Sequence, residues 1–279
     1  MLARLRMTDR PKGAARENAY ALARSGHYAR PQQKRGTIPA MLETDTRLQC
    51  AACGQAIGTT YFRLPGRNEA YCTRCATERP RCATCGVPLS DRSWRLHDGR
   101  ILCERCNTTA IYHPEEALRL YTETTAAIVR QLGLELRVGV EFRLVDAPTL
   151  ADVQQHSAVS QPADEVIFGL YYRHGRNRTI YMLYGLPKLT FRAVVAHEYA
   201  HAWQSENCPL LDNEALREGF AEWVAYRHLT YLGCRKAAAR MLASPHPYRP
   251  FLEQMLKLEE ISGPLGVMQH MLAAGSSGG

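Results

Sequence analysis

The chain has 279 residues, 46% of them hydrophobic, and a formal net charge of +8 at pH 7. This length suggests about two domains around a sizeable core. No stretch approaches ~18 consecutive apolar residues, and no apolar run follows the charged start. We therefore expect no membrane span, no secretory signal and a cytoplasmic protein.

Most of the positive charge lies at the start of the chain. Residues 1–40 hold nine Lys or Arg against Asp9 and Glu17, which is +7 of the total of +8. We interpret this segment as a basic, disordered tail with a helical turn or two at residues 18–23, and we assign it no function beyond weak contact with nucleic acid or acidic surfaces. The rest of the chain is close to neutral, which argues against a DNA-reading face.

Eight of the ten cysteines form four Cys-x-x-Cys pairs. Paired thiols that recur after 18 and 17 residues suit two tetrahedral four-cysteine zinc sites. The expected ligands are Cys50, Cys53, Cys72 and Cys75 at the first site, and Cys82, Cys85, Cys103 and Cys106 at the second. Disulfides or free thiols are the alternative, which the lack of an export signal disfavours.

Two successive zinc sites at residues 41–110 resemble a LIM domain, a protein-interaction module. Two features differ from the usual LIM pattern: Cys72 stands where a histidine is common, and six residues rather than two join the halves. Because four thiolates leave no open position, we expect a structural role. Cys208 and Cys234 lie outside the pattern, and we interpret them as core or partly buried thiols, with approach of Cys208 to a metal as the alternative.

Residues 111–279 read as a second, α+β domain. Pro114 and Gly133 bound a predicted helix, residues 137–145 alternate like a strand, and residues 166–173 and 179–184 read as a β-hairpin. The second strand leads toward the stretch that begins at Ala193, and we expect it to have a free edge that can pair with an extended peptide. We expect further helices at residues 235–243 and 251–260, and a flexible end at residues 275–279.

The stretch from Ala193 to Trp203 contains His-Glu-x-x-His among helix-forming residues. Residues four apart share a helix face, so His197 and His201 can ligate one metal ion, and Glu198 can reach a metal-bound water. This is the pattern of a zinc-dependent hydrolase. The alternative is an amphipathic helix with two incidental histidines.

A second predicted helix begins near Asp212 and supplies the third ligand. Sixteen residues separate His201 from Glu218, enough for the chain to turn and return alongside. We expect Glu218 to complete the site, and Gly219 to let two helices approach closely beside it. Glu222, one turn further on, could accept a hydrogen bond from a ligand imidazole, or could be a solvated surface carboxylate.

Several of these segments resemble the LIM-domain, ubiquitin-activated zinc peptidases that limit plant organ growth. The resemblance runs from about residue 80 to 230 and is carried by residues 80–85, 98–106, 183–188, 196–203 and 218–219. It implies a gluzincin-type metallopeptidase domain with a small sheet and active-site helices. It also places His197, His201 and Glu218 on the metal ligands and Glu198 on the catalytic base. The plant proteins carry acidic ubiquitin-interacting helices where this chain is basic, so ubiquitin activation stays open, and we expect a minimal relative, with a bacterial source as one option.

The sequence thus predicts a zinc metallopeptidase with one catalytic and two structural zinc ions. We expect an endopeptidase that acts on proteins and uses the LIM-like module for substrate or partner binding, ubiquitin included. Tyr181, Tyr184, Tyr226 and His228 are the candidates for stabilising the oxyanion. One alternative is an adaptor whose peptidase fold serves as a binding platform, and another is a nucleic-acid binder that uses the basic tail.

Overall fold

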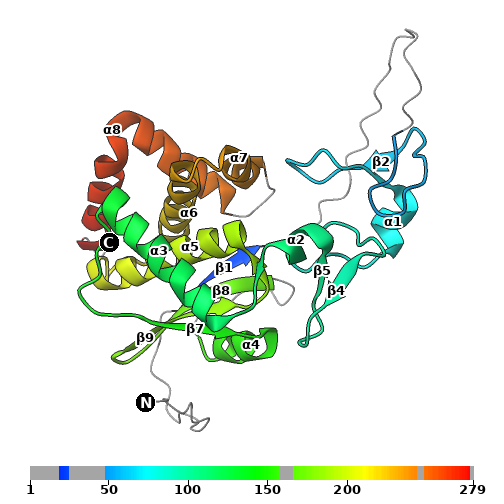
Figure 1. Ribbon diagram of the computed structural model, residues 1–279. Helices are drawn as coiled ribbons and strands as arrows, with labels where there is room; N and C mark the ends of the chain where they lie inside the picture. Colours follow the sequence, from blue (N-terminus) through cyan, green and yellow to red (C-terminus); the bar gives the residue numbers. More distant parts are fainter. Residues whose placement is uncertain (1–18, 25–47, 158–165, 244–247, 277–279) are drawn as a thin grey trace.

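The computed structural model describes residues 19–24, 48–157, 166–243 and 248–276, which form a zinc module and a mixed α/β body (Figure 1). The zinc module contains two short antiparallel hairpins, each followed by a short helix. The first consists of β2 (Tyr61–Phe62), β3 (Tyr71–Cys72) and α1 (Thr73–Glu78), and the second of β4 (Ser93–Arg95), β5 (Ile101–Cys103) and α2 (Glu104–Thr108).

The body is built on a four-stranded sheet with the order β1-β8-β9-β7. The predicted hairpin is confirmed as β8 (Val166–His174) and β9 (Asn177–Leu183), which are antiparallel, while β7 (Glu141–Val145) runs parallel to β9. The expectation that the second hairpin strand has a free edge is wrong, because β9 is paired on both sides. Strand β8 pairs with β9 along one edge, and its opposite edge also pairs with a strand.

That edge of β8 carries β1 (Ala19–Arg24), which runs antiparallel to it from Ala19 opposite Tyr172 to Arg24 opposite Val166. The prediction of a helical turn at residues 18–23 within a disordered tail is therefore wrong for this part of the segment. The local composition gave no strand signal, and the partner that makes the strand lies about 150 positions further along the chain. The rest of residues 1–40 lies outside the described residues.

Four long helices and the nine-residue helix α7 pack on this sheet or on one another. They are α3 (Pro114–Leu132), α5 (Lys188–Asn207), α6 (Glu214–Tyr231), α7 (Arg235–Ala243) and α8 (Arg249–Ser276). The helices expected after Pro114 and over residues 235–243 are confirmed. The sequence missed the short α4 (Ala147–Gln155). It also ended the last helix too early, since α8 continues past a break at Gly263 and Gly275 is buried against Cys208 rather than flexible.

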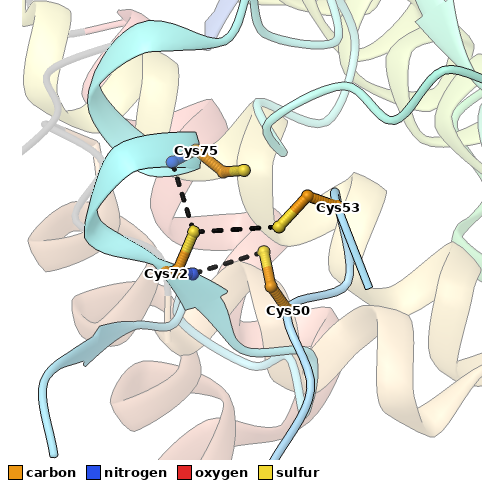
Figure 2. A group of neighbouring side chains, drawn as sticks. All are labelled: Cys50, Cys53, Cys72 and Cys75. Carbon is orange, nitrogen blue, oxygen red and sulfur yellow. Dashed lines mark hydrogen bonds between the residues drawn. The ribbon is translucent and has the colours of Figure 1, made fainter. Parts of the chain in front are cut away.

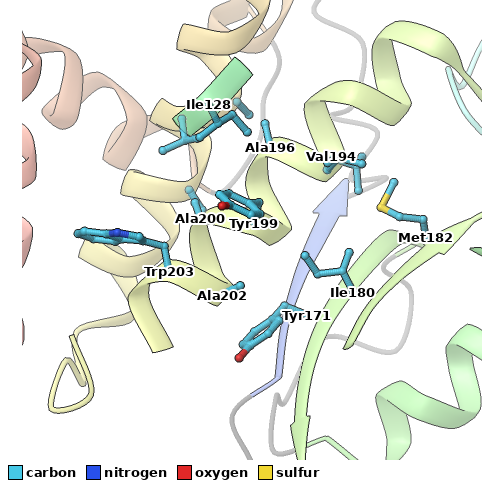
Figure 3. Close-up of a cluster of buried hydrophobic side chains, with 14 of the residues drawn as sticks. Ile128, Tyr171, Ile180, Met182, Val194, Ala196, Tyr199, Ala200, Ala202 and Trp203 are labelled. Atoms are coloured by element: carbon cyan, nitrogen blue, oxygen red, sulfur yellow. The ribbon is translucent and has the colours of Figure 1, made fainter. Parts of the chain in front are cut away.

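Helix α5 lies at the centre of the body, between the sheet on one side and α3 and α6 on the other (Figure 1). Its side chains are buried almost continuously from Ala193 to Ser205. Figure 3 shows Val194 directed toward Ile180 and Met182 of β9, and Ala196 near Ile128 of α3. Because α5 is enclosed on all sides, its polar residues are held in place by the surrounding core.

The second zinc hairpin is attached to the body at the segment that leads into α5. Strand β6 (Ala110–Ile111) pairs with β10 (Leu186–Pro187), and Nη2 of Arg100 donates to the carbonyl of Tyr184 at 2.8 Å. The fully buried carboxylate of Asp98 accepts from Arg100 Nε at 2.8 Å and from the backbone N–H of Ala147 at 3.2 Å. The zinc module and the body therefore share buried polar contacts. No helix among the described residues is long and apolar enough to cross a membrane.

Candidate metal centres

The eight paired cysteines meet in two groups of four, as the spacing predicts. Figure 2 shows the first group, in which Cys50 and Cys53 lie on a turn, and Cys72 and Cys75 lie at the end of β3 and in α1. The Sγ atoms of Cys53 and Cys72 are 4.0 Å apart, and those of Cys85 and Cys103 are 3.6 Å apart. Thiolates bound to one tetrahedral zinc ion stand ~3.8 Å apart, so these sulfur positions fit the metal.

Backbone N–H groups point at the sulfurs in both groups. The N–H of Cys72 donates to Cys50 Sγ at 3.3 Å, and the N–H of Cys103 donates to Cys82 Sγ at the same distance. Burial raises the pKa of Cys50, but these backbone hydrogen bonds outweigh it and lower the pKa to about 6. At Cys50 the thiolate, which is the form that binds metal, is therefore favoured, whereas burial and the neighbouring thiols raise the pKa of Cys75 to about 12.

A third group of potential ligands lies at the centre of the body. Residues four apart on α5 place Nε2 of His197 and Nε2 of His201 2.9 Å from each other. Helix α6, which begins with Asn213 capping the N–H of Leu216, brings Glu218 to the same point. Its Oε2 lies 3.3 Å from His197 Nε2, and its Oε1 lies 3.5 Å from His201 Nε2.

These atoms suit a zinc ion in both chemistry and spacing. Ligand atoms about 2.0–2.1 Å from a tetrahedral ion stand ~3.3–3.5 Å from one another, close to the nitrogen–oxygen distances observed here. The two imidazoles and the carboxylate are almost completely buried, with 0–4% of each residue exposed. Three protein ligands leave one position for a water or substrate oxygen.

The pKa values of the buried cluster indicate that it stabilises one positive charge. Burial lowers the pKa of His197, but the carboxylates of Glu218 and Glu222 outweigh burial and raise that pKa to about 10. For His201 burial prevails over the Glu218 carboxylate and lowers the pKa to about 4. Burial likewise raises the pKa of Glu218, yet the neighbouring imidazoles hold it well below its usual range. A bound cation would supply the charge that the carboxylates stabilise here.

Glu198 is fully buried, next to His197 in the chain, and is held from the sheet. The backbone N–H of Tyr171 in β8 donates to Glu198 Oε2 at 2.8 Å. This close approach of β8 to α5 depends on Gly169, because a Cβ there would lie 2.5 Å from Val194 Cγ1 and 3.2 Å from Glu198 Cγ. The hydrogen bond from Tyr171 was missed by the sequence analysis, since a backbone donor leaves no residue-type signal.

Other side chains lie next to the second nitrogen atom of each imidazole. Nδ1 of His197 lies 3.4 Å from Glu222 Oε1, which is the place expected for Glu222 and not that of a surface carboxylate, since Glu222 is only 5% exposed. Nδ1 of His201 lies 2.9 Å from Gln204 Oε1, and Gln204 in turn donates to the carbonyl of Arg217 at 2.9 Å. Gln204 was also missed, although its spacing of three residues from His201 on one helix could have indicated it.

Several further expectations can be placed. Gly219 does allow a close helix approach, but its neighbour is Phe251 of α8, whose Cβ would lie 2.8 Å from an added Cβ. Cys208 is buried and donates to the carbonyl of Met271 in α8.

Among the oxyanion candidates, Tyr184 stacks on His97 of the zinc module, with ring centroids 4.5 Å apart. The pKa of the buried His228 falls to about 4, first through burial and then through Arg192.

Fold and sites together define a protein with a LIM-like zinc-binding module of two four-cysteine sites, followed by a mixed α/β body with a buried His-His-Glu cluster. Residues 50–110 match the LIM domain family, and residues 149–248 match the DA1-like family, described as Protein DA1. The second match contains every residue of the buried cluster. The chain is homologous to the DA1 proteins of Arabidopsis thaliana.

The relatives are distant and longer. Protein DA1-related 6 of Arabidopsis thaliana is 24% identical over 208 residues, which cover 62% of this chain and 32% of the relative. Protein DA1 of the same plant is 22% identical, over 65% of this chain and 41% of the relative, and LIM domain-containing protein HDR3 of Oryza sativa subsp. japonica is 24% identical, over 56% and 39%. This chain therefore spans about a third to two fifths of their length. No solved structure matches it.

Proposed function

We propose that this protein is a zinc metallopeptidase of the gluzincin type that hydrolyses peptide bonds in protein substrates. The observation that carries the proposal is the meeting of His197, His201 and Glu218 at one buried point. Glu198 follows His197 in α5, and its carboxylate accepts a hydrogen bond from the backbone N–H of Tyr171. Two imidazoles and a carboxylate as ligands, with a second carboxylate as the base, are the set that one class of zinc peptidases uses.

The proposed roles follow from where the side chains lie. His197, His201 and Glu218 hold the ion, which when bound lowers the pKa of its water to about 7 and polarises a carbonyl. Glu198 takes a proton from the attacking water and passes it to the leaving amine. The hydrogen bond from Tyr171 N–H fixes one oxygen of Glu198, so the other oxygen is oriented for this transfer. Glu222 and Gln204 keep the imidazoles in the orientation that ligation needs.

We assign the LIM-like module to substrate or partner binding. Its second hairpin is fixed to the segment before α5 through Arg100 and Asp98, so a protein bound to the module would be held near the metal site. Protein partners, ubiquitin among them, fit this role, because LIM modules are interaction modules. The proposal predicts three zinc ions per chain, two held by thiolates and one by the buried cluster.

The test combines metal analysis with cleavage. Purified protein is assayed against a peptide library of mixed sequence, with the products read by mass spectrometry, alongside Glu198→Gln and the matched control Glu115→Gln on the exposed first turn of α3. Wild type and the control should cut the same sites. Glu198→Gln should keep three zinc ions and the wild-type melting temperature but leave the library intact, because only the base has been removed.

Two results would overturn the proposal. The first is a Glu198→Gln protein that cuts the library at the wild-type rate. The second is a wild-type protein that holds three zinc ions and cuts nothing, which would favour the adaptor function instead. A chelator series adds detail: the ion with three protein ligands should leave before the two held by four thiolates.

A further inference from the structure

A cleft of about 420 Å³ opens where β8 and α5 end side by side. Three arginines from different elements line it: Arg137 before β7, Arg173 of β8 and Arg178 of β9. Ser205 and Glu206, from the last turns of α5, form its other wall. We call this group the arginine cleft.

The charge of the arginine cleft is not balanced within it. Glu206, its one carboxylate, accepts from the backbone N–H groups of Arg137 and Val138, both at 2.9 Å, and is paired with Arg178. Burial raises the pKa of Glu206, but these partners outweigh it and keep the group ionised. Three guanidinium groups therefore face one carboxylate whose oxygens are already engaged. The surplus of two positive charges suits a carboxylate ligand.

The cleft and Glu198 lie along the same two elements, β8 and α5. Arg173 lies two residues after Tyr171 in β8, so the side chains of Tyr171 and Arg173 are on the same face of the strand. The backbone N–H of Tyr171 is the donor to Glu198. Along α5, Ser205 follows Glu198 by seven residues, about two turns, and so lies on the same helix face. Arg173 Nη1 donates to Ser205 Oγ at 3.2 Å, which joins the end of β8 to the end of α5 at the cleft.

The edge of β8 accepts an antiparallel strand, because β1 occupies it in that direction. A peptide in this place would run from Arg173 toward Val166. A residue opposite Arg173 would point to the same face as Arg173, into the cleft. Glu198 lies beside Gly169, where an added Cβ would be 3.2 Å from its Cγ. The residue at the cleft thus precedes the residue opposite Gly169 by about four positions.

We propose that the arginine cleft is a subsite for an acidic side chain of the substrate, about four residues on the N-terminal side of the cleaved bond. The proposal rests on the proposed peptidase function and adds its specificity. Arg173 is the central residue, with Arg137 contributing charge from a more exposed position, since 74% of its side chain is exposed.

The test uses the full chain and pairs of cleavable peptides that differ only by Glu or Gln at one position, moved through the residues before the bond. Residues 19–24 lie on the same edge and must leave for a peptide to bind, but this competition affects both peptides equally and cancels in the ratio of kcat/KM. The wild-type ratio should favour Glu at the cleft position by about tenfold, the size of one partly exposed charge-assisted hydrogen bond. Arg173→Gln should bring it near one, Arg137→Gln should reduce it less, and Arg176→Gln at the exposed hairpin tip should leave it unchanged.

A binding measurement keeps the subsite separate from catalysis. Fluorescence anisotropy of the same peptides on Glu198→Gln protein, with Lys as a third side chain, should show the order Glu, Gln, Lys. The added change Arg173→Glu should reverse that order. If the Glu and Gln peptides are equal at every position in both measurements, the arginine cleft is no subsite, while the peptidase function stands. If nothing is cleaved but the binding order holds and reverses, the peptidase function fails and the subsite stands.

Discussion

The chain holds its metal ligands in two ways, and the zinc module and the body differ in what fixes them. Each four-cysteine site takes its ligands from two short turns, within a stretch of about 25 residues, and the backbone N–H groups next to the cysteines point at the sulfurs. The central cluster takes its ligands from two long helices that pack on each other inside the core. Few buried apolar side chains surround the two thiolate sites, whereas the imidazole site lies inside a large apolar core.

This difference predicts which site depends on its metal for folding. The zinc module has only a small apolar cluster, in which several members are the ligand cysteines themselves. Structural zinc binding is coupled to folding in such modules. The helices around His197 and His201 bury a large apolar core around them, so the body should keep its fold when the third ion is removed.

The largest effect is expected from Cys82→Ser. It removes a thiolate of the second site, which should then lose its ion, and because its hairpin holds Tyr184 and Ala147 through Arg100 and Asp98, the loss should reach the body. We expect a loss of more than ~4 kcal/mol in the free energy of unfolding, as for removal of a structural metal, together with one zinc fewer per chain.

Thermal unfolding and elemental analysis check this, with Cys234→Ser, which lies outside both sites, as the control. A Cys82→Ser protein with a wild-type melting temperature would remove the contrast between the two kinds of site.

The next effect concerns the third ligand of the central cluster. Glu218→Ala should lose the third ion and all cleavage. It should also lower the melting temperature of the metal-free protein, because the buried His197 loses one of the two carboxylates that stabilise its positive charge. Glu222→Ala removes only the carboxylate 3.4 Å from His197 Nδ1, so the ion should stay with ~10–100-fold weaker affinity. Zinc competition titrations of both variants measure this. Tight retention by Glu218→Ala, next to loss in Glu222→Ala, would exchange their roles.

The smallest effect is expected from Gln204→Ala. It removes the acceptor 2.9 Å from His201 Nδ1, and because the amide is neutral, zinc affinity should fall only toward the lower end of the range for outer partners, about tenfold. The same titration measures it, and Gln154→Ala on the separate helix α4 is the matched control. No change in zinc affinity would show that the core alone orients His201.

The local features of both kinds of site follow from the sequence. The spacing of four Cys-x-x-Cys pairs determines two groups of four sulfurs, because two residues between thiols fit a single turn. The spacing of His197 and His201 determines that their imidazoles share a helix face. The sequence also predicted both ends of α3. Pro114 lies at its first position, and Gly133, with a φ of 66°, ends it.

Only the tertiary structure decided what those features meet. The sequence predicted a free edge on β9, but β7 and β8 pair with both of its edges. Alternation of apolar residues shows which face a strand buries and does not show which strands will pair with it. The strand β1 also comes from a segment with no strand signal. The hydrogen bond from Tyr171 to Glu198, the contact of Gly219 with Phe251 and the meeting of three arginines beside Ser205 join residues far apart in the chain. Such contacts depend on how α5 packs between the sheet and the other helices, and that packing is a property of the whole core rather than of any one segment.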